Sequence, residues 1–242
     1  MEPFTIQQVK EDIYLITEPY FYEHANLYLI KGTKYDLLVD CGIGAADLRE
    51  FLLARGFRPR VLLTHAHFDH AGGLRHFKPE EILATRSVLG NLRDRGHWGL
   101  EYLTPEEFDG KTFTTLTGRT PEEFCSTFSM LLPEGVAPLS LSQLAIGDYR
   151  FDLIPVPGHT DDSLMIFDRA SALLVSGDTL YDGKLYADLP NSDIPAFMRA
   201  LRLIQKLAPA RTLPGHNQLL DRAATVRVIT KWLDALSREH KK

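Results

Sequence analysis

The chain has 242 residues, with 27 Lys and Arg against 32 Asp and Glu, and a formal net charge of −5. This acidic balance argues against nucleic acid as a partner, because phosphate binding relies on clustered Lys and Arg. No run approaches the ~18 apolar residues that span a bilayer, and few cysteines with no secretory pattern at the start predict a cytoplasmic location.

Short apolar runs separated by Gly, Pro, Asp and Lys predict a β-meander in the first part of the chain, with strands at 13–16, 26–30 and 37–39. The segment 18–24 lies between the first two runs and is predicted to be a hairpin loop with three consecutive aromatic residues. The apolar spacing over 45–55 predicts an amphipathic helix, and the apolar run 61–64 predicts a buried strand.

The middle of the chain, 85–145, breaks this rhythm of strands and loops. We expect a helical, turn-rich insertion whose aromatic residues mostly pack a small core of their own, within a single domain that spans 1–242. The second half returns to the earlier pattern, with predicted strands at 151–156, 172–176 and 211–213. Apolar residues at steps of three or four predict helices over 194–207 and 221–239.

Histidine and aspartate follow four of the predicted strands. The sequence has nine His but only two Cys, so a bound metal would need His and carboxylate ligands. Ligands gather beyond the carboxyl ends of strands in open α/β sheets, and imidazole with carboxylate suits zinc, iron or manganese. The residues at these strand ends are His65, His67, Asp69, His70, His159, Asp178 and His216. Seven such ligands are enough for two metals that share a bridging carboxylate.

The local spacing supports this interpretation. His65 and His67 are two residues apart, so both side chains face the same way in an extended segment. Asp69 and His70 then enter a turn closed by two glycines, where they can face a second point. The four other histidines are interpreted as surface or hydrogen-bonded residues: His24, His76, His97 and His240.

With these motifs in place, the sequence resembles the metallo-β-lactamase-fold superfamily. The matching segments are Thr-His-Ala-His-Phe-Asp-His-Ala-Gly-Gly, Pro-Gly-His-Thr, Ser-Gly-Asp-Thr and Leu-Pro-Gly-His, and they extend over nearly the whole chain. The resemblance implies an α/β protein with an αββα sandwich, in which the insertion 85–145 caps the site. It implies that His65, His67 and His159 hold a first metal, that Asp69, His70 and His216 hold a second, and that Asp178 bridges. Asp40 would orient the ligands from behind.

Within that superfamily the sequence looks like the branch of metallo-β-lactamase-domain-containing protein 2, described as an acyl-coenzyme A thioesterase. This resemblance implies a dinuclear hydrolase that cleaves an acyl thioester with a metal-bridging hydroxide, with two divalent ions, zinc first and iron or manganese as alternatives. Asp69 could orient the hydroxide. Tyr181 is either a donor to the developing oxyanion or a packed tyrosine at a strand end. We expect an apolar substrate groove walled by Tyr20, Phe21, Tyr22 and Trp98.

Other functions remain open on the same residues. A lactonase or β-lactamase would use the same scaffold, and a persulfide dioxygenase would hold one iron instead of two hydrolytic metals. A non-catalytic ligand sensor is a further alternative, although decay of the site should have removed some ligands and all are present. The partner is expected to be a small acyl thioester, lactone or lactam, and the chain could form a homodimer.

Overall fold

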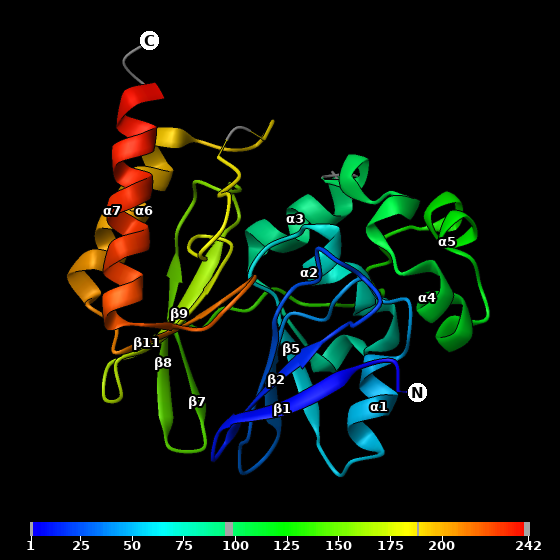
Figure 1. Ribbon diagram of the computed structural model, residues 1–242. Coiled ribbons are helices and arrows are strands. Elements are labelled where there is room, and N and C mark those ends of the chain that lie inside the picture. The colour runs from blue at the N-terminus through cyan, green and yellow to red at the C-terminus, as the bar shows by residue number, and fades with distance from the viewer. Residues whose placement is uncertain (1, 95–98, 188, 240–242) are drawn as a thin grey trace. The chain divides into compact units, whose positions relative to one another are not determined.

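A computed structural model describes residues 2–94, 99–187 and 189–239. The chain divides into two compact units, Met1–Leu139 and Ser140–Lys242, and each unit contains one six-stranded mixed sheet (Figure 1). Among the described residues, no helix is long and apolar enough to cross a membrane. The expectation of one domain over 1–242 stays a prediction.

The sheet of the first unit runs in chain order from edge to edge. Its first four strands form an antiparallel meander, and the fourth, fifth and sixth strands pair in parallel. The strands are β1 (Thr5–Lys10), β2 (Ile13–Thr17), β3 (Leu27–Ile30), β4 (Asp36–Val39), β5 (Pro59–Leu62) and β6 (Ile82–Leu83). The predicted strands at 13–16, 26–30, 37–39 and 61–64 are thus confirmed, with shifts of one or two residues at their ends.

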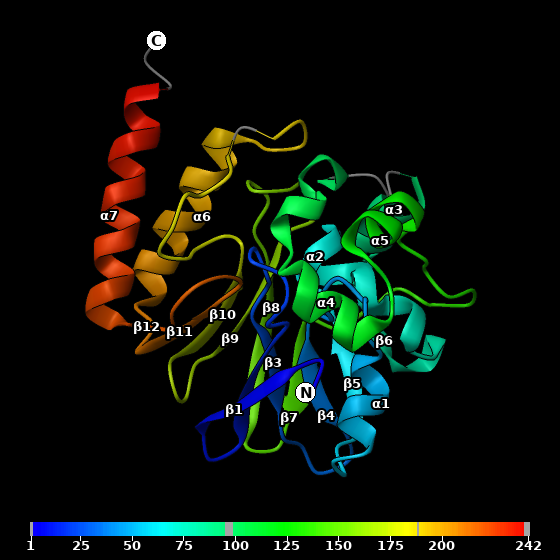
Figure 2. The same ribbon diagram turned by 45° about the vertical axis from the view of Figure 1, so that its right-hand side comes forward.

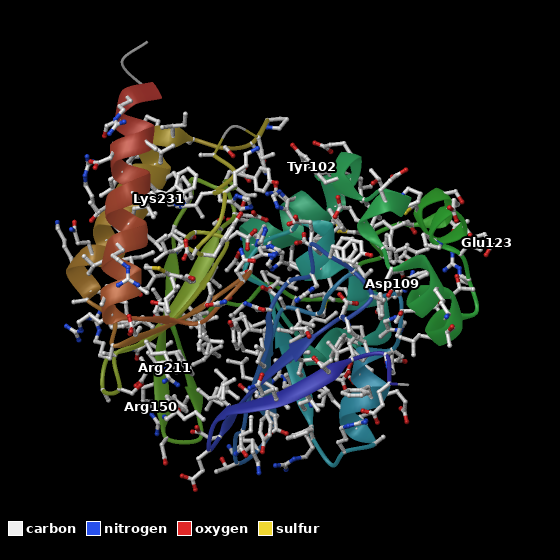
Figure 3. All side chains as sticks on the ribbon, in the orientation of Figure 1. Tyr102, Asp109, Glu123, Arg150, Arg211 and Lys231 are labelled. Atoms are coloured by element: carbon white, nitrogen blue, oxygen red, sulfur yellow. The ribbon has the colours of Figure 1, made fainter. Side chains whose placement is uncertain are left out.

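Three helices of the first unit, α1, α4 and α5, begin at residues whose side chains cap the first turn. Helix α1 (Leu48–Leu53) is shorter than the predicted 45–55, because the Asp47 side chain accepts the Glu50 N–H and so fixes the first turn. The other helices are α2 (Phe68–Ala71), α3 (Arg86–Asp94), α4 (Gly110–Thr117) and α5 (Pro121–Thr127). Asp109 caps α4, and Glu123 completes a capping box at the start of α5 (Figure 3).

An aromatic cluster joins the insertion to the loop 18–24. Tyr20 and Phe21 from that loop and Phe68 from α2 pack with three phenylalanines of the insertion: Phe108, Phe113 and Phe124. Ring centroids lie 4.9 Å apart for Phe21 and Phe108, and 6.1 Å apart for Phe21 and Phe68. The phenylalanines of the insertion do pack against one another, as expected for most of its aromatic residues, with 4.8 Å between the ring centroids of Phe108 and Phe113, and they also pack against the hairpin loop. The apolar surface of the hairpin loop was available to them, and burying it there is more favourable than leaving it in water.

The sheet of the second unit has its own meander and its own parallel pair. Its strands are β7 (Gln143–Ile146), β8 (Tyr149–Pro155), β9 (Leu164–Asp168), β10 (Leu173–Gly177), β11 (Arg211–Pro214) and β12 (Leu220–Asp221). β10 and β11 are parallel, and the other neighbours are antiparallel. The predicted insertion boundary at 145 falls inside β7, so this sheet begins earlier than expected.

Helices α6 (Ile194–Leu207) and α7 (Arg222–Glu239) lie side by side along the sheet of this unit in both views (Figures 1 and 2). Their apolar faces pack against β8, β9 and β10 in one buried cluster. α6 has the predicted bounds, because the Asp193 side chain caps its first turn and Pro195 is compatible with that turn. α7 begins one residue later than predicted.

Candidate metal centre

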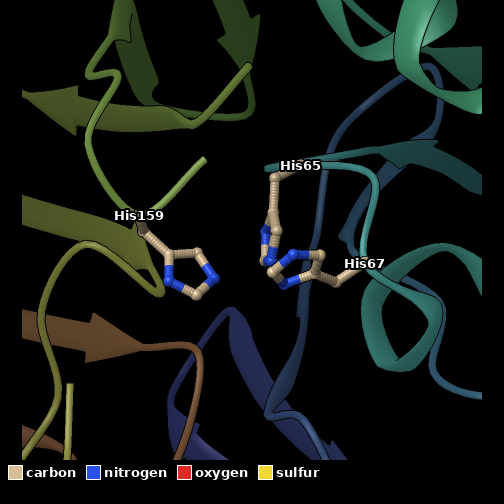
Figure 4. A group of neighbouring side chains, drawn as sticks. All are labelled: His65, His67 and His159. Atoms are coloured by element: carbon tan, nitrogen blue, oxygen red, sulfur yellow. The ribbon is translucent and has the colours of Figure 1, made fainter. Parts of the chain in front are cut away.

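The first unit places Asp40 and its candidate ligands where two of its parallel strands, β4 and β5, end. Asp40 follows β4, and the segment with His65 and His67 follows β5. The rings of His65 and His67 lie 4.6 Å apart between centroids, and those of His65 and His70 lie 4.2 Å apart. Figure 4 shows His65 and His67 on this segment, with His159 of the second unit also drawn. All of these histidines are buried, so the predicted grouping after β5 is a real cluster.

Two glycines let this cluster close onto the loop after β4. A Cβ atom at Gly72 would lie 2.6 Å from the Ile43 carbonyl oxygen, and one at Gly73 would meet the Cys41 carbonyl oxygen. The loop also receives backbone hydrogen bonds, since Gly73 N–H donates to the Gly42 carbonyl at 3.0 Å. The Gly-Gly pair thus serves a close backbone approach, which a side chain would prevent.

Asp40 holds the histidine cluster from behind. Its Oδ2 lies 2.7 Å from His70 Nδ1 and accepts the Thr64 hydroxyl at 2.8 Å, while its Oδ1 accepts the Thr64 N–H at 2.8 Å. His65 Nδ1 lies 3.0 Å from the same Thr64 hydroxyl. A partner on Nδ1 fixes the ring and its tautomer and directs Nε2 towards a metal, which is the usual arrangement of histidine ligands.

The second unit repeats this placement. Asp178 and His216 follow the parallel strands β10 and β11, and His159 follows β8. Asp178 Oδ2 lies 3.6 Å from His159 Nε2 and 3.3 Å from His216 Nε2, so one carboxylate oxygen faces both imidazoles. His159 Nδ1 is held 2.8 Å from the Tyr186 carbonyl oxygen, which again makes Nε2 the candidate ligand atom.

These spacings fit a divalent metal. Two ligand atoms on a tetrahedral ion with bonds of 2.0–2.1 Å are about 3.3–3.4 Å apart. Within the first unit, Asp69 Oδ2 and His70 Nε2 are 3.4 Å apart, and the two pairs in the second unit are 3.3 Å and 3.6 Å apart. Buried imidazole and carboxylate are the donors that such ions prefer. The chain therefore carries His and Asp clusters able to bind metal ions.

Tyr181 is buried beside this second-unit cluster. Its ring packs edge-on against His216, with centroids 5.2 Å apart, and its hydroxyl donates to the Lys184 carbonyl at 2.6 Å. In this conformation the single hydroxyl hydrogen is used within the loop that also presents the Tyr186 carbonyl to His159. The two roles that the sequence leaves open for Tyr181, a donor to the oxyanion or a packed tyrosine, both stay predictions.

The residues predicted to wall the substrate groove differ in their exposure. Tyr20 and Phe21 are fully buried in the aromatic cluster, whereas the Tyr22 side chain is 63% exposed. Tyr22 is fixed through its backbone, because its N–H donates to the Glu107 carbonyl at 2.8 Å. Trp98 lies outside the described residues. Of the four, Tyr22 is the described side chain that can touch a ligand without rearrangement of the cluster.

Three groups near the cluster were missed in the sequence. Thr64 is the common partner of His65 and Asp40, and it stands within the recognised motif. The Tyr186 carbonyl is a backbone group, so its residue type carries no signal. Glu18 is a buried carboxylate beside the loop after β4. A charged residue between two apolar runs was the available hint, but such residues are usually exposed.

The remaining histidines and cysteines have ordinary surroundings. His24 Nδ1 lies 2.8 Å from the Phe21 carbonyl oxygen, and His76 Nε2 lies 3.2 Å from the Gly44 carbonyl oxygen, as expected for hydrogen-bonded residues. His97 and His240 lie outside the described residues. Burial, together with the charge of Asp40, raises the pKa of the Cys41 thiol well above its usual value, so this cysteine stays protonated.

The sequence matches the family described as "Metallo-beta-lactamase superfamily" over residues 22–216. An acyl-coenzyme A thioesterase MBLAC2 from Gallus gallus is 30% identical over 261 residues, which cover 100% of this chain and 90% of the chicken protein. The MBLAC2 from Homo sapiens is 27% identical over an alignment that covers 100% of this chain and 91% of the human protein. Among solved structures, the metallo-beta-lactamase family protein TTHA1429 from Thermus thermophilus superposes with a TM-score of 0.69 at 21% identity, covering 96% of this chain and 81% of that chain.

Proposed function

Since the chain belongs to the metallo-β-lactamase superfamily, we propose that it is a dinuclear metal hydrolase that cleaves acyl thioesters of the acyl-coenzyme A type. The predicted α/β class, the metallo-β-lactamase fold and the hydrolase character are confirmed. The observation that carries the dinuclear proposal is Asp178 Oδ2, which faces His159 Nε2 at 3.6 Å and His216 Nε2 at 3.3 Å. A carboxylate oxygen between two imidazole ligands is what a bridge between two ions requires.

We assign the ligands as the sequence predicts. One ion would be held by His65, His67 and His159, the other by Asp69, His70 and His216, and Asp178 would contribute to both. Zinc is the proposed metal, because buried imidazole and carboxylate suit it and the ligand spacings match its bond lengths. The two free cysteines, Cys41 and Cys125, agree with the proposed cytoplasmic location.

A divalent ion, when bound, lowers the pKa of a coordinated water towards ~7 and so supplies hydroxide at neutral pH. The residues of the chain hold and orient the reacting groups. Asp40 keeps the proton of His70 on Nδ1, and the Tyr186 carbonyl does the same for His159. Asp69 would accept a hydrogen bond from the attacking water in addition to its role as a ligand. Burial of these side chains keeps bulk water away from them.

The leaving group favours a thioester. A thiol has a pKa of about 8.5, so a thiolate departs near neutral pH without a proton donor. An amide nitrogen needs a proton, and the cluster contains no dedicated acid among its described residues. The relatives named acyl-coenzyme A thioesterase point the same way. Tyr22, exposed beside the insertion, supplies apolar surface for the acyl chain, and we propose that the insertion 85–145 caps the site.

Metal quantification on the purified protein, followed by an activity panel on the same sample, tests the proposal. We expect about two zinc ions per chain and turnover of acyl-coenzyme A above that of a lactone or a lactam. His67→Ala should lower the metal content and abolish turnover. His24→Ala is the matched control, because His24 is not a proposed ligand and its Nδ1 lies 2.8 Å from the Phe21 carbonyl oxygen. One iron per chain with oxygen uptake on a persulfide, or full activity after complete metal removal, would overturn the proposal.

A further inference from the structure

Glu18 is a buried carboxylate that belongs to none of the recognised motifs. It follows β2, its side chain is 0% exposed, and it lies in the same unit as the His65–His70 cluster. A carboxyl group in such a position costs free energy unless hydrogen bonds replace the water that it loses. The hydrogen bonds of Glu18 must therefore offset the cost of burying its carboxyl group.

Both oxygens of Glu18 are engaged. Oε2 accepts the Ile43 N–H at 2.9 Å, and Oε1 accepts the Tyr20 hydroxyl at 3.1 Å. Gly42 lies directly against the carboxyl group, since a Cβ atom there would be 2.5 Å from Oε2. The carboxyl group is thus packed onto the backbone of the loop 40–44, with Tyr20 holding it from the other side.

The loop 40–44 has an unusual backbone. Asp40, Gly42 and Gly44 have φ values of 62°, 71° and 71°, so every second residue is left-handed. The conformation at Asp40 is uncommon for a residue with a side chain and persists only where the surroundings impose it. Ile43 is the residue between the two left-handed glycines, and the bond from its N–H to Glu18 fixes the loop at that point.

The same loop is bonded to the proposed ligand segment. Cys41 N–H donates to the His70 carbonyl at 2.8 Å, and Gly73 N–H donates to the Gly42 carbonyl at 3.0 Å. The loop begins with Asp40, whose Oδ2 lies 2.7 Å from His70 Nδ1. Displacement of the loop would therefore change the hydrogen bond that sets the orientation of the His70 ring.

We propose that Glu18 is a positioning residue, which fixes the loop 40–44 and through it the Asp40–His70 hydrogen bond. The inference rests on the proposed function, in which His70 is a metal ligand. Burial raises the pKa of Glu18 to about 7, so both the neutral and the charged acid occur near neutral pH. Each form offers an oxygen to the Ile43 N–H, and positioning does not depend on the charge.

Two kinds of substitution test the role. Glu18→Ala removes both hydrogen bonds, and Glu18→Asp withdraws the carboxyl group from Ile43 by one methylene. Glu18→Gln keeps an acceptor for the Ile43 N–H and should restore the position. The control is Asp36→Ala, which removes another buried carboxylate at the start of β4. Asp36 accepts two backbone N–H groups, from Gly32 at 3.0 Å and Arg58 at 2.7 Å, and no proposed ligand lies in the turn that they form.

Zinc affinity by chelator competition and the visible spectrum of the cobalt-substituted protein are the measurements. We expect Glu18→Ala and Glu18→Asp to weaken metal affinity about 10- to 100-fold and to change the cobalt spectrum, as residues behind a ligand do. Glu18→Gln and Asp36→Ala should leave both unchanged, although Asp36→Ala lowers the melting temperature.

Wild-type affinity and spectrum in Glu18→Asp, or in a folded Glu18→Ala, would overturn the positioning role while the proposed function stands. Absence of metal binding in the wild-type protein would instead overturn the proposed function.

Discussion

Replacement of Asp40 by Asn should disable His70 as a metal ligand without removing any ligand. Asn keeps the size of Asp40, and its Oδ1 can still accept the Thr64 N–H. Its amide group then stands where Oδ2 lies 2.7 Å from His70 Nδ1. Because an amide donates, His70 must accept through Nδ1 and carry its proton on Nε2. That proton occupies the atom that the metal needs.

The magnitude follows from the bonds involved. Loss of a partner behind a metal ligand typically weakens affinity 10- to 100-fold, or about 1.4–2.7 kcal/mol. The metal-free protein should also lose about 2 kcal/mol of stability, because a hydrogen bond to a charged group contributes roughly 1.5–3 kcal/mol. Asp40→Asn is thus expected to lower both metal affinity and stability. Only the loss of metal affinity depends on the contact between Asp40 and His70.

A matched control separates them. Asp168 has the same pattern of acceptance: Oδ1 takes the Arg150 N–H at 2.8 Å, and Oδ2 takes the N–H and hydroxyl of Ser171 at 2.8 Å and 2.6 Å. Asp168→Asn should lower the free energy of unfolding in urea to a similar extent and leave zinc affinity, measured by chelator competition, unchanged. If Asp40→Asn and Asp168→Asn bind zinc equally well, the tautomer argument is refuted.

Three further predictions concern other groups. Tyr181→Phe should retain turnover and lose about 1 kcal/mol of stability, because the hydroxyl bonds a carbonyl of its own loop; a loss of ~100-fold or more in kcat would make it an oxyanion donor. Gly215→Ala places a methyl group onto Asp178 Oδ1 and should deplete the metal measured by elemental analysis, whereas Gly90→Ala enters open space and should not. Glu18 has a folded pKa of about 7 against an ordinary 4.5, so the folded protein binds more protons between these values. The stability that Glu18 contributes is therefore fully present below the unfolded pKa and is lost as pH rises through 7, by up to about 3 kcal/mol. The free energy of unfolding in urea should depend less on pH in Glu18→Gln than in the wild-type protein between these two pKa values.

The sequence predicts best those features whose cause is local. α6 has its predicted bounds because a capping Asp193 and a long apolar period act within one segment. Of the strands that were missed, β1, β6 and β12 lack such a cause, whereas β9 is a fully buried apolar run whose local pattern should have predicted it. β1 is an edge strand with no buried residue, so its sequence shows no apolar alternation, and β6 and β12 have two residues each. Their strand character comes from neighbours that the local pattern does not contain.

The same distinction applies to the candidate site. The proposed ligand residues could be predicted because each follows an apolar run, which is a local pattern, and each motif has a specific composition. Glu18 could not be assigned in this way, since its meaning depends on Ile43, 25 positions later. The Tyr186 carbonyl leaves no trace at all, because every residue has that group. Contacts that orient the proposed ligands without binding the metal are thus less predictable from the sequence than the proposed ligands themselves.

Asp40 and Asp178 have equivalent positions in the topology of their sheets but different contacts. Each follows the first strand of the parallel pair in its own unit, β4 and β10, and each stands beside a histidine. Topology alone would give them the same role. However, both oxygens of Asp40 are occupied by Thr64 and by Nδ1 of His70, the nitrogen turned away from the proposed metal. Asp178 Oδ2 instead faces the Nε2 atoms of two histidines, and this difference in contacts supports the proposal of Asp178 as a ligand and of Asp40 as a residue that orients one.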